Sequence, residues 1–137
     1  LTAHVLLAAA GGAGADGAEQ AAEAARVLCL AHDFLSMEVE ALALLGWLRA
    51  SRGALVEASA AVDAASARLN ADVTVERPAA VRMLLARSYE RLGAAEDAAR
   101  AWEAARDVVV GQAERVRGEA ARERFRATKD VAELLSR

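Results

Sequence analysis

The chain has 137 residues, which is within the usual size of one domain, and a formal net charge of only −3. Hydrophobic residues make up 55% of it and aromatic residues 4%, and most of the apolar positions are alanine, the strongest helix former and a residue too small to fill a wide core. Runs of β-branched and aromatic residues with a period of two are almost absent, which excludes a β-sheet. We therefore expect a single all-α domain of closely packed helices.

Turn signals divide the chain into blocks of helical length. Glycines and the segment from Asn70 to Pro78 mark the boundaries between these blocks. The pattern predicts six or seven helices, over residues 1–10, 16–32, 34–51, 54–69, 78–91, 94–115 and 119–136. Pro78 fits the first turn of a helix, where its missing N–H costs nothing.

The glycine-rich segment at residues 11–17 lies between the first two predicted helices. It superficially resembles a phosphate-binding loop, but no Lys-Ser/Thr follows it and no strand precedes it. We interpret it as a flexible turn, with Asp16 as the N-cap of the following helix. Near the end of that helix, Cys29 is expected to be a small buried hydrophobe, and His32 is expected to interact with the last helix carbonyls.

The N-terminal residues do not have the pattern of a signal peptide or a membrane span. The chain starts at Leu1 without a basic segment, and the apolar run at residues 5–10 is too short to cross a bilayer. The single cysteine cannot form an internal disulfide, which is typical of a cytoplasmic protein. We expect a cytoplasmic chain that is a segment of a longer protein and has no membrane partner.

The chain repeats itself with a period of 40 residues. A shift of 40 aligns Leu42-x-x-Leu45-Gly46-x-x-Arg49 with Arg82-x-x-Leu85-Ala86-x-x-Tyr89, and Gly53 with Gly93. The same shift aligns Ala58-x-x-x-Val62-x-x-Ala65 with Ala98-x-x-x-Trp102-x-x-Ala105. Helical blocks of equal length joined by short turns are the pattern of a helical-repeat array.

These positions resemble the tetratricopeptide (TPR) family, whose first helix carries Leu-Gly and then Tyr, and whose second carries Ala with an aromatic residue four later. The residues at matching positions are Leu45, Gly46, Tyr89, Ala58, Ala98 and Trp102. The resemblance implies antiparallel helix pairs stacked as a right-handed solenoid, with repeats at about 1–33, 34–70 and 78–115. The proline after the second helix is missing and the repeat is longer than the usual 34 residues, as in variants found in large bacterial regulators, polarity adaptors and kinesin light chains.

In this family the first helix of each repeat lines a concave groove that binds a partner peptide or helix. The matching positions here are Ala43, Trp47 and Ala50 in the second repeat, Met83, Arg87, Glu90 and Arg91 in the third, Leu7 in the first, and Glu123 and Ala127 in the fourth. Trp47 beside small alanines would accept an apolar anchor, and Arg87 and Arg91 would pair with carboxylates. The two-carboxylate clamp of the family uses asparagine where this chain has Trp47 and Arg87, so an internal peptide or a helix is the expected ligand.

A purely structural role for these residues stays open. Trp47 lies among leucines that compete for the core, and Arg87 and Arg91 could pair with Glu90 on a solvated helix face. Tyr89 and Trp102 are expected to fill the gap between neighbouring helix pairs.

The last predicted helix, over residues 119–136, differs in character because charged residues surround a thin apolar stripe. Such a helix is typical of the cap that shields the end of a repeat array. The alternatives are a connector to a further domain and a dimerisation helix, and an exposed end of the array would allow self-association. Acidic residues interleave with its arginines, which argues against nucleic-acid binding.

The residue types required for catalysis are scarce. The two histidines, His4 and His32, lie on different predicted helices without the Glu-x-x-His spacing of a di-metal bundle, and no Ser-His or Cys-His pair follows from spacing. We expect no enzyme activity, no metal and no cofactor. The sequence favours a protein–protein interaction scaffold, with a regulatory module of a larger bacterial transcriptional or signalling protein as the alternative.

Overall fold

A computed structural model describes residues 14–32, 34–71 and 73–137. The described residues form seven α-helices and no β-strand: α2 (Gly14–Ala31), α3 (Leu35–Ser51), α4 (Leu55–Asn70), α5 (Pro78–Arg91), α6 (Ala95–Arg115), α7 (Glu119–Ala127) and α8 (Lys129–Leu135). The predicted all-α class is therefore confirmed for this part of the chain. The helix predicted over residues 1–10, which includes Leu7, lies outside the described residues.

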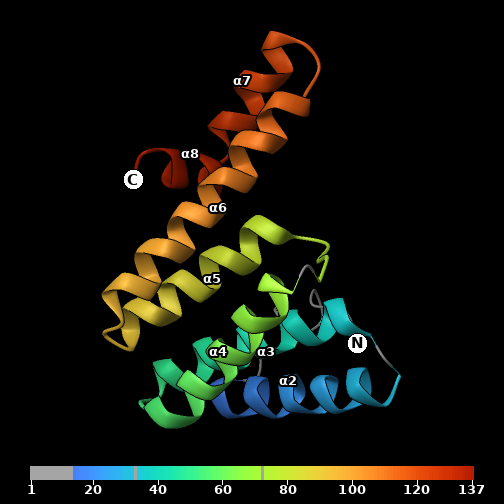
Figure 1. The fold of residues 1–137 in the computed structure, drawn as a ribbon, viewed down its shortest axis with the longest axis vertical. Helices are drawn as coiled ribbons and strands as arrows, with labels where there is room; N and C mark the ends of the chain where they lie inside the picture. The colour runs from blue at the N-terminus through green and yellow to red at the C-terminus, as the bar shows by residue number, and fades with distance from the viewer. Residues whose placement is uncertain (1–13, 33, 72) are drawn as a thin grey trace.

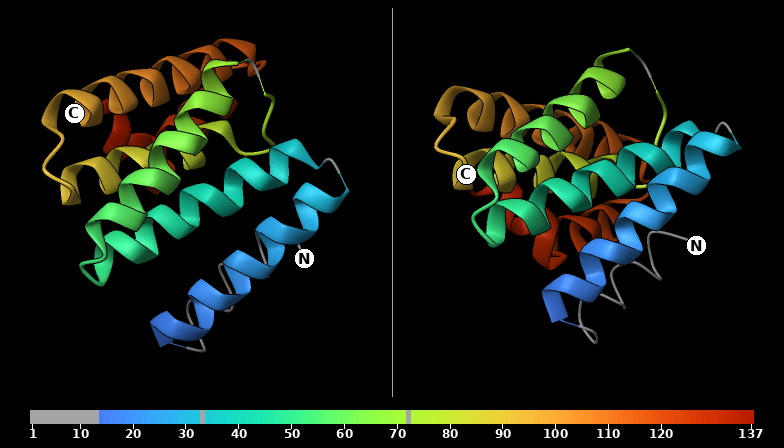
Figure 2. Two further views of the ribbon diagram at one scale, coloured as in Figure 1. Left: turned by 60° about the horizontal axis from the view of Figure 1, so that its bottom comes forward. Right: turned by 90° about the horizontal axis from the view of Figure 1, so that it is seen from below.

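Along the long axis, α2 lies at one end and α7 at the other, and α8 turns back from α7 to lie beside α6 (Figure 1). Neighbours pack as pairs, α3 on α4 and α5 on α6, and α3 also contacts α2 and α5. Figure 2 shows α2 and α3 running side by side. Because α3 has neighbours on several sides, most of its side chains are buried, including the carboxylates of Glu38 and Glu40.

The turns inside the two pairs have the same geometry at positions 40 residues apart. Gly53 and Gly93 both have a positive φ, 85° and 75°, where a residue with a Cβ would be strained. The N–H of Ala54 donates to the carbonyl of Arg49, and the N–H of Ala94 donates to that of Tyr89, both at 2.9 Å. This is the Schellman ending of a helix. The repeated glycine therefore marks a repeated turn.

Helices α3 and α4 cross closely where the sequence has its smallest residues. A Cβ added to Gly46 would clash with Cγ2 of Val62 and lie 3.4 Å from the Val62 nitrogen. Leu45 and Ala58, beside this crossing, are fully buried. In the next pair, Ala86 is fully buried and Ala98 is almost fully buried. The expected role of these small residues, close packing within a pair, is confirmed at Gly46.

Two boundaries differ from the prediction. Helix α2 begins at Gly14, so Asp16 lies within the helix and the prediction that it is the N-cap is wrong. The helix predicted over residues 119–136 is broken at Thr128, which has extended backbone angles (φ −60°, ψ 144°). Both the backbone N–H and the hydroxyl of Thr128 donate to the carbonyl of Phe125. This local bonding competes with helix continuation, which is a known property of threonine.

The buried side chains form two clusters. The larger one joins α2, α3, α4 and α5, together with Ala98 of α6 and Val75 from the segment between α4 and α5. The smaller one consists of Met83, Ala105, Val109 and Leu134, from α5, α6 and α8. In the part of the chain that the structure describes, no helix is long and apolar enough to cross a membrane.

Candidate functional site

The residues expected to line the groove are distributed over α3 and α5, and burial divides them into two groups. Ala43 and Met83 are buried, so neither offers surface to a partner. Ala50, the third position on α3, is buried as well. Trp47 and Arg87 are half-buried, and Glu90 and Arg91 are exposed. Only the second group therefore presents side chains at the surface.

Trp47 and Arg91 lie together although they come from consecutive helix pairs. The guanidinium carbon of Arg91 is 5.6 Å from the centre of the Trp47 ring, a cation–π arrangement. The indole also packs against the larger core cluster. The half-buried Trp47 is therefore partly packed in the core and partly at the surface beside Arg91, and its contact with a ligand stays a prediction.

Arg87 and Glu90 do not pair with each other and instead bind other helices. The indole N–H of Trp102 on α6 donates to Oε1 of Glu90 at 2.8 Å. Arg87 donates to Oε2 of Glu133 on α8 at 3.1 Å, and its guanidinium carbon is 5.8 Å from the Trp102 ring centre. These two residues therefore hold α5 to α6 and α8.

Helix α8 occupies the remaining part of the expected groove. Its Leu134 is fully buried in the smaller cluster with Met83 and Val109. Arg137, just beyond α8, lies over the Trp102 ring at 3.6 Å from its centre. A segment of the chain itself thus covers the Met83 and Arg87 end of α5, and the open part of the groove is reduced to Trp47 and Arg91.

The two positions carried over to the fourth repeat lie on α7. Glu123 and Ala127 are exposed there, and none of the α7 residues is buried. Among the described helices, α7 packs only on α6 and α8. Glu123 and Ala127 therefore do not lie with Trp47 and Arg91, which are on α3 and α5.

Tyr89 has the packing role expected of it. It is buried between α4 and α6, and its hydroxyl bonds to Ser66 at 2.9 Å and to Oδ1 of Asp63 at 3.2 Å. Burial raises the pKa of the Tyr89 hydroxyl. The hydroxyl therefore stays protonated and links α5 to α4.

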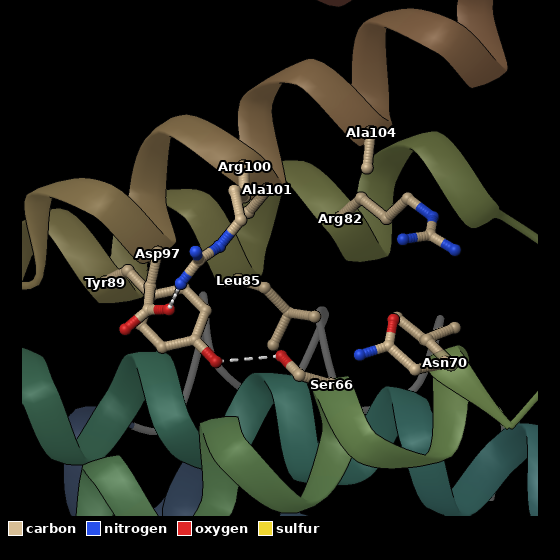
Figure 3. Close-up of a pocket in the computed structure, with 10 residues that line it drawn as sticks. Ser66, Asn70, Arg82, Leu85, Tyr89, Asp97, Arg100, Ala101 and Ala104 are labelled. Carbon is tan, nitrogen blue, oxygen red and sulfur yellow. Dashed lines mark hydrogen bonds and ion pairs between the residues drawn. The ribbon is translucent and has the colours of Figure 1, made fainter.

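Beside Tyr89, a cavity of about 380 Å³ opens between α4, α5 and α6 (Figure 3). Its apolar walls include Leu69, Leu85 and two alanines of α6, Ala101 and Ala104. Its charged lining residues are Arg82, Asp97 and Arg100. Sequence reasoning did not single out Arg82, although the 40-residue alignment contains the signal: Arg82 stands where the preceding repeat has the buried Leu42.

The remaining ionisable groups have mainly structural partners. Glu38, which is 2% exposed, pairs with Arg68 at 2.7 Å and so joins α3 to α4. Cys29 is buried as predicted, and this burial raises the pKa of its thiol. His32 follows the end of α2 as predicted and stacks on Phe34. Within the described ranges, no three His, Cys, Asp or Glu side chains come together as a metal site would require.

Comparisons with protein-family models, with curated proteins and with solved structures found no match for this chain.

Proposed function

We propose that the chain is a protein–protein interaction scaffold made of stacked, TPR-like helix pairs. The resemblance to the TPR family supports this proposal, as do the repeated turns at Gly53 and Gly93 and the close crossing at Gly46. The partner is a peptide or a helix of another protein, and the chain carries out no chemistry of its own.

The observation that carries the proposal is the pair formed by Trp47 and Arg91. A half-buried indole held against the core is a rigid anchor, and tryptophan and arginine are the residues most enriched at binding hot spots. Arg91 makes no ion pair with any described residue, so its charge is available to a ligand. The partner that fits has an apolar side chain for the Trp47 face and a carboxylate for Arg91.

Selection from a random peptide library on the immobilised chain tests this proposal. The enriched peptides should combine an apolar and an acidic residue. Their affinity should fall by about 2 kcal/mol, roughly 30-fold, in Trp47→Ala. Arg91→Ala should weaken binding less and should reduce its dependence on salt.

Val56→Ala is the matched control because Val56 is 82% exposed on α4, a helix that carries neither Trp47 nor Arg91. It should leave the affinity unchanged. Equal binding of the selected peptides to Trp47→Ala and the wild type would contradict the proposal. Loss of the thermal unfolding transition in Trp47→Ala would also contradict it, because Trp47 would then serve only the core.

A further inference from the structure

A second site is built around Arg82, on the side of α5 that faces α4 and α6. We propose that the cavity between these helices binds the carboxylate of a small organic acid, with Arg82 as the group that holds the anion. Neither Trp47 nor Arg91 takes part, so the inference goes beyond the proposed scaffold function and does not depend on it.

Among the described residues, Arg82 has no hydrogen-bond or ion-pair partner. Its Nε has no access to solvent and no hydrogen-bond acceptor among the described residues. No ion pair of Arg82 is found within the described ranges either. A buried N–H without an acceptor costs on the order of 1–3 kcal/mol. Because Arg82 lines the cavity, an anion there would supply the missing counter-charge of the guanidinium.

The second argument comes from the charges that line the cavity. Asp97 and Arg100 pair with each other at the Tyr89 end, where the Tyr89 and Ser66 hydroxyls are also bonded together (Figure 3). At the other end, the guanidinium of Arg82 and the side-chain amide of Asn70 face each other (Figure 3). Counting pairs among the described residues, the lining therefore carries one unpaired charge, which is positive and stands beside an amide able to donate a second hydrogen bond.

The third argument is the comparison with the preceding repeat. Leu42, the residue aligned with Arg82, is almost completely buried in the core. A leucine at position 82 would suit the apolar floor formed by Leu69 and Leu85 and would need no partner. The repeat itself does not require an arginine here, which indicates that the guanidinium serves a ligand.

The shape of the cavity determines the class of acid. A volume of about 380 Å³ is within the range of small-molecule sites. Arginine binds a carboxylate through two parallel N–H bonds, and the apolar body of the acid would lie against Leu85, Ala101 and Ala104. A small-molecule site of this kind fits the regulatory module considered from the sequence.

Titration of the ¹⁵N-labelled chain with acetate, hexanoate and benzoate tests the proposal, with the Arg82 Nε–H resonance as the direct probe. Hexanoate or benzoate should bind saturably, shift this resonance and bind more tightly than acetate. Arg82→Gln and Arg82→Leu should each weaken binding by about tenfold or more. Arg82→Leu should also unfold at a temperature no lower than the wild type, so lost binding cannot be attributed to lost structure.

Arg117→Gln is the matched control, because Arg117 is exposed between α6 and α7 and does not line the cavity. It should leave the affinity for benzoate unchanged. The proposal is wrong if none of the three acids binds, if Arg82→Gln binds them as the wild type does, or if neutral benzamide binds as tightly as benzoate. Tighter binding of inorganic phosphate than of every acid would also overturn it, because the ligand class would then be wrong.

Discussion

Substitution of Gly46 by alanine tests the helix crossing on which the fold depends. The added Cβ would lie within 3.0 Å of Cγ2 of Val62. Val62 is fully buried and β-branched, so its side chain has one strongly preferred rotamer in a helix and cannot turn away. Overpacking of this kind costs about 1–3 kcal/mol, whereas replacing a helical glycine by alanine gains about 1 kcal/mol. The added Cβ would come closer to Val62 than real Cβ atoms do, so the overpacking cost lies at the upper end, about 2–3 kcal/mol, and we expect Gly46→Ala to lower the free energy of unfolding by roughly 1–2 kcal/mol.

Urea unfolding followed by far-UV circular dichroism measures this loss, which corresponds to a melting temperature lower by about 3 °C for each kcal/mol. Gly111 provides the matched control because a Cβ added there would meet only the end of Arg115, at 3.9 Å. Gly111→Ala should therefore stabilise the chain by about 0.5–1 kcal/mol. In a Val62→Ala background, Gly46→Ala should lose most of its cost. The reasoning is refuted if Gly46→Ala is as stable as the wild type.

Two further predictions concern α8 and a buried carboxyl group. Leu134→Ala removes the buried anchor of α8 and should cost about 2–3 kcal/mol locally, so hydrogen exchange should accelerate in α8 while α3 keeps its protection. Equal acceleration in both helices would show that α8 does not undock by itself. Burial raises the pKa of the Glu40 carboxyl above its ordinary value of 4.5, and its Oε1 has no hydrogen-bond partner among the described residues. Because the buried charge is unfavourable, Glu40→Gln should stabilise the chain at neutral pH. The destabilisation by the charged Glu40 is absent below the pKa of the unfolded chain and grows as pH rises through the pKa of the folded chain. The stabilisation by Glu40→Gln, measured by urea unfolding, should therefore be smaller near pH 4 than at neutral pH. Equal stabilisation at both pH values would contradict a destabilising charge on Glu40.

The helix boundaries could be predicted because the turns have strong local signals. Gly53 and Gly93 have positive φ values that favour glycine, and Pro78 lies in the first turn of α5 as expected. The break at Thr128 could not be predicted, because the residues on both sides of it continue a helical pattern. The break depends on whether Thr128 bonds to Phe125 or continues the helix, and the packing of Leu134 against α5 and α6 influences that choice.

The surroundings of the residues expected to line the groove could be predicted only in part for a related reason. Helical period places Met83, Arg87 and Arg91 on one face of α5, but it does not say what covers that face. The seven residues of α8 have the same apolar spacing as the end of a longer helix, so their position over Met83 follows from tertiary packing alone. The isolation of Arg82 is likewise a tertiary property, although the Leu42 alignment marks the position as unusual.

The abundance of alanine connects the fold with both proposed sites. Within a pair, small side chains allow the helices to approach closely, as Gly46 and Ala58 do. Between pairs, the backbones of α4 and α6 stay farther apart, with no described Cα atoms within 8 Å of each other, and small residues such as Ala101 and Ala104 leave a cavity there. Larger side chains must then join one pair to the next, as Tyr89 does through its bonds to α4. Alanine-rich helix pairs thus leave space between them, and both proposals rest on the larger side chains there: Arg82 in the cavity, and Trp47 with Arg91 at the surface.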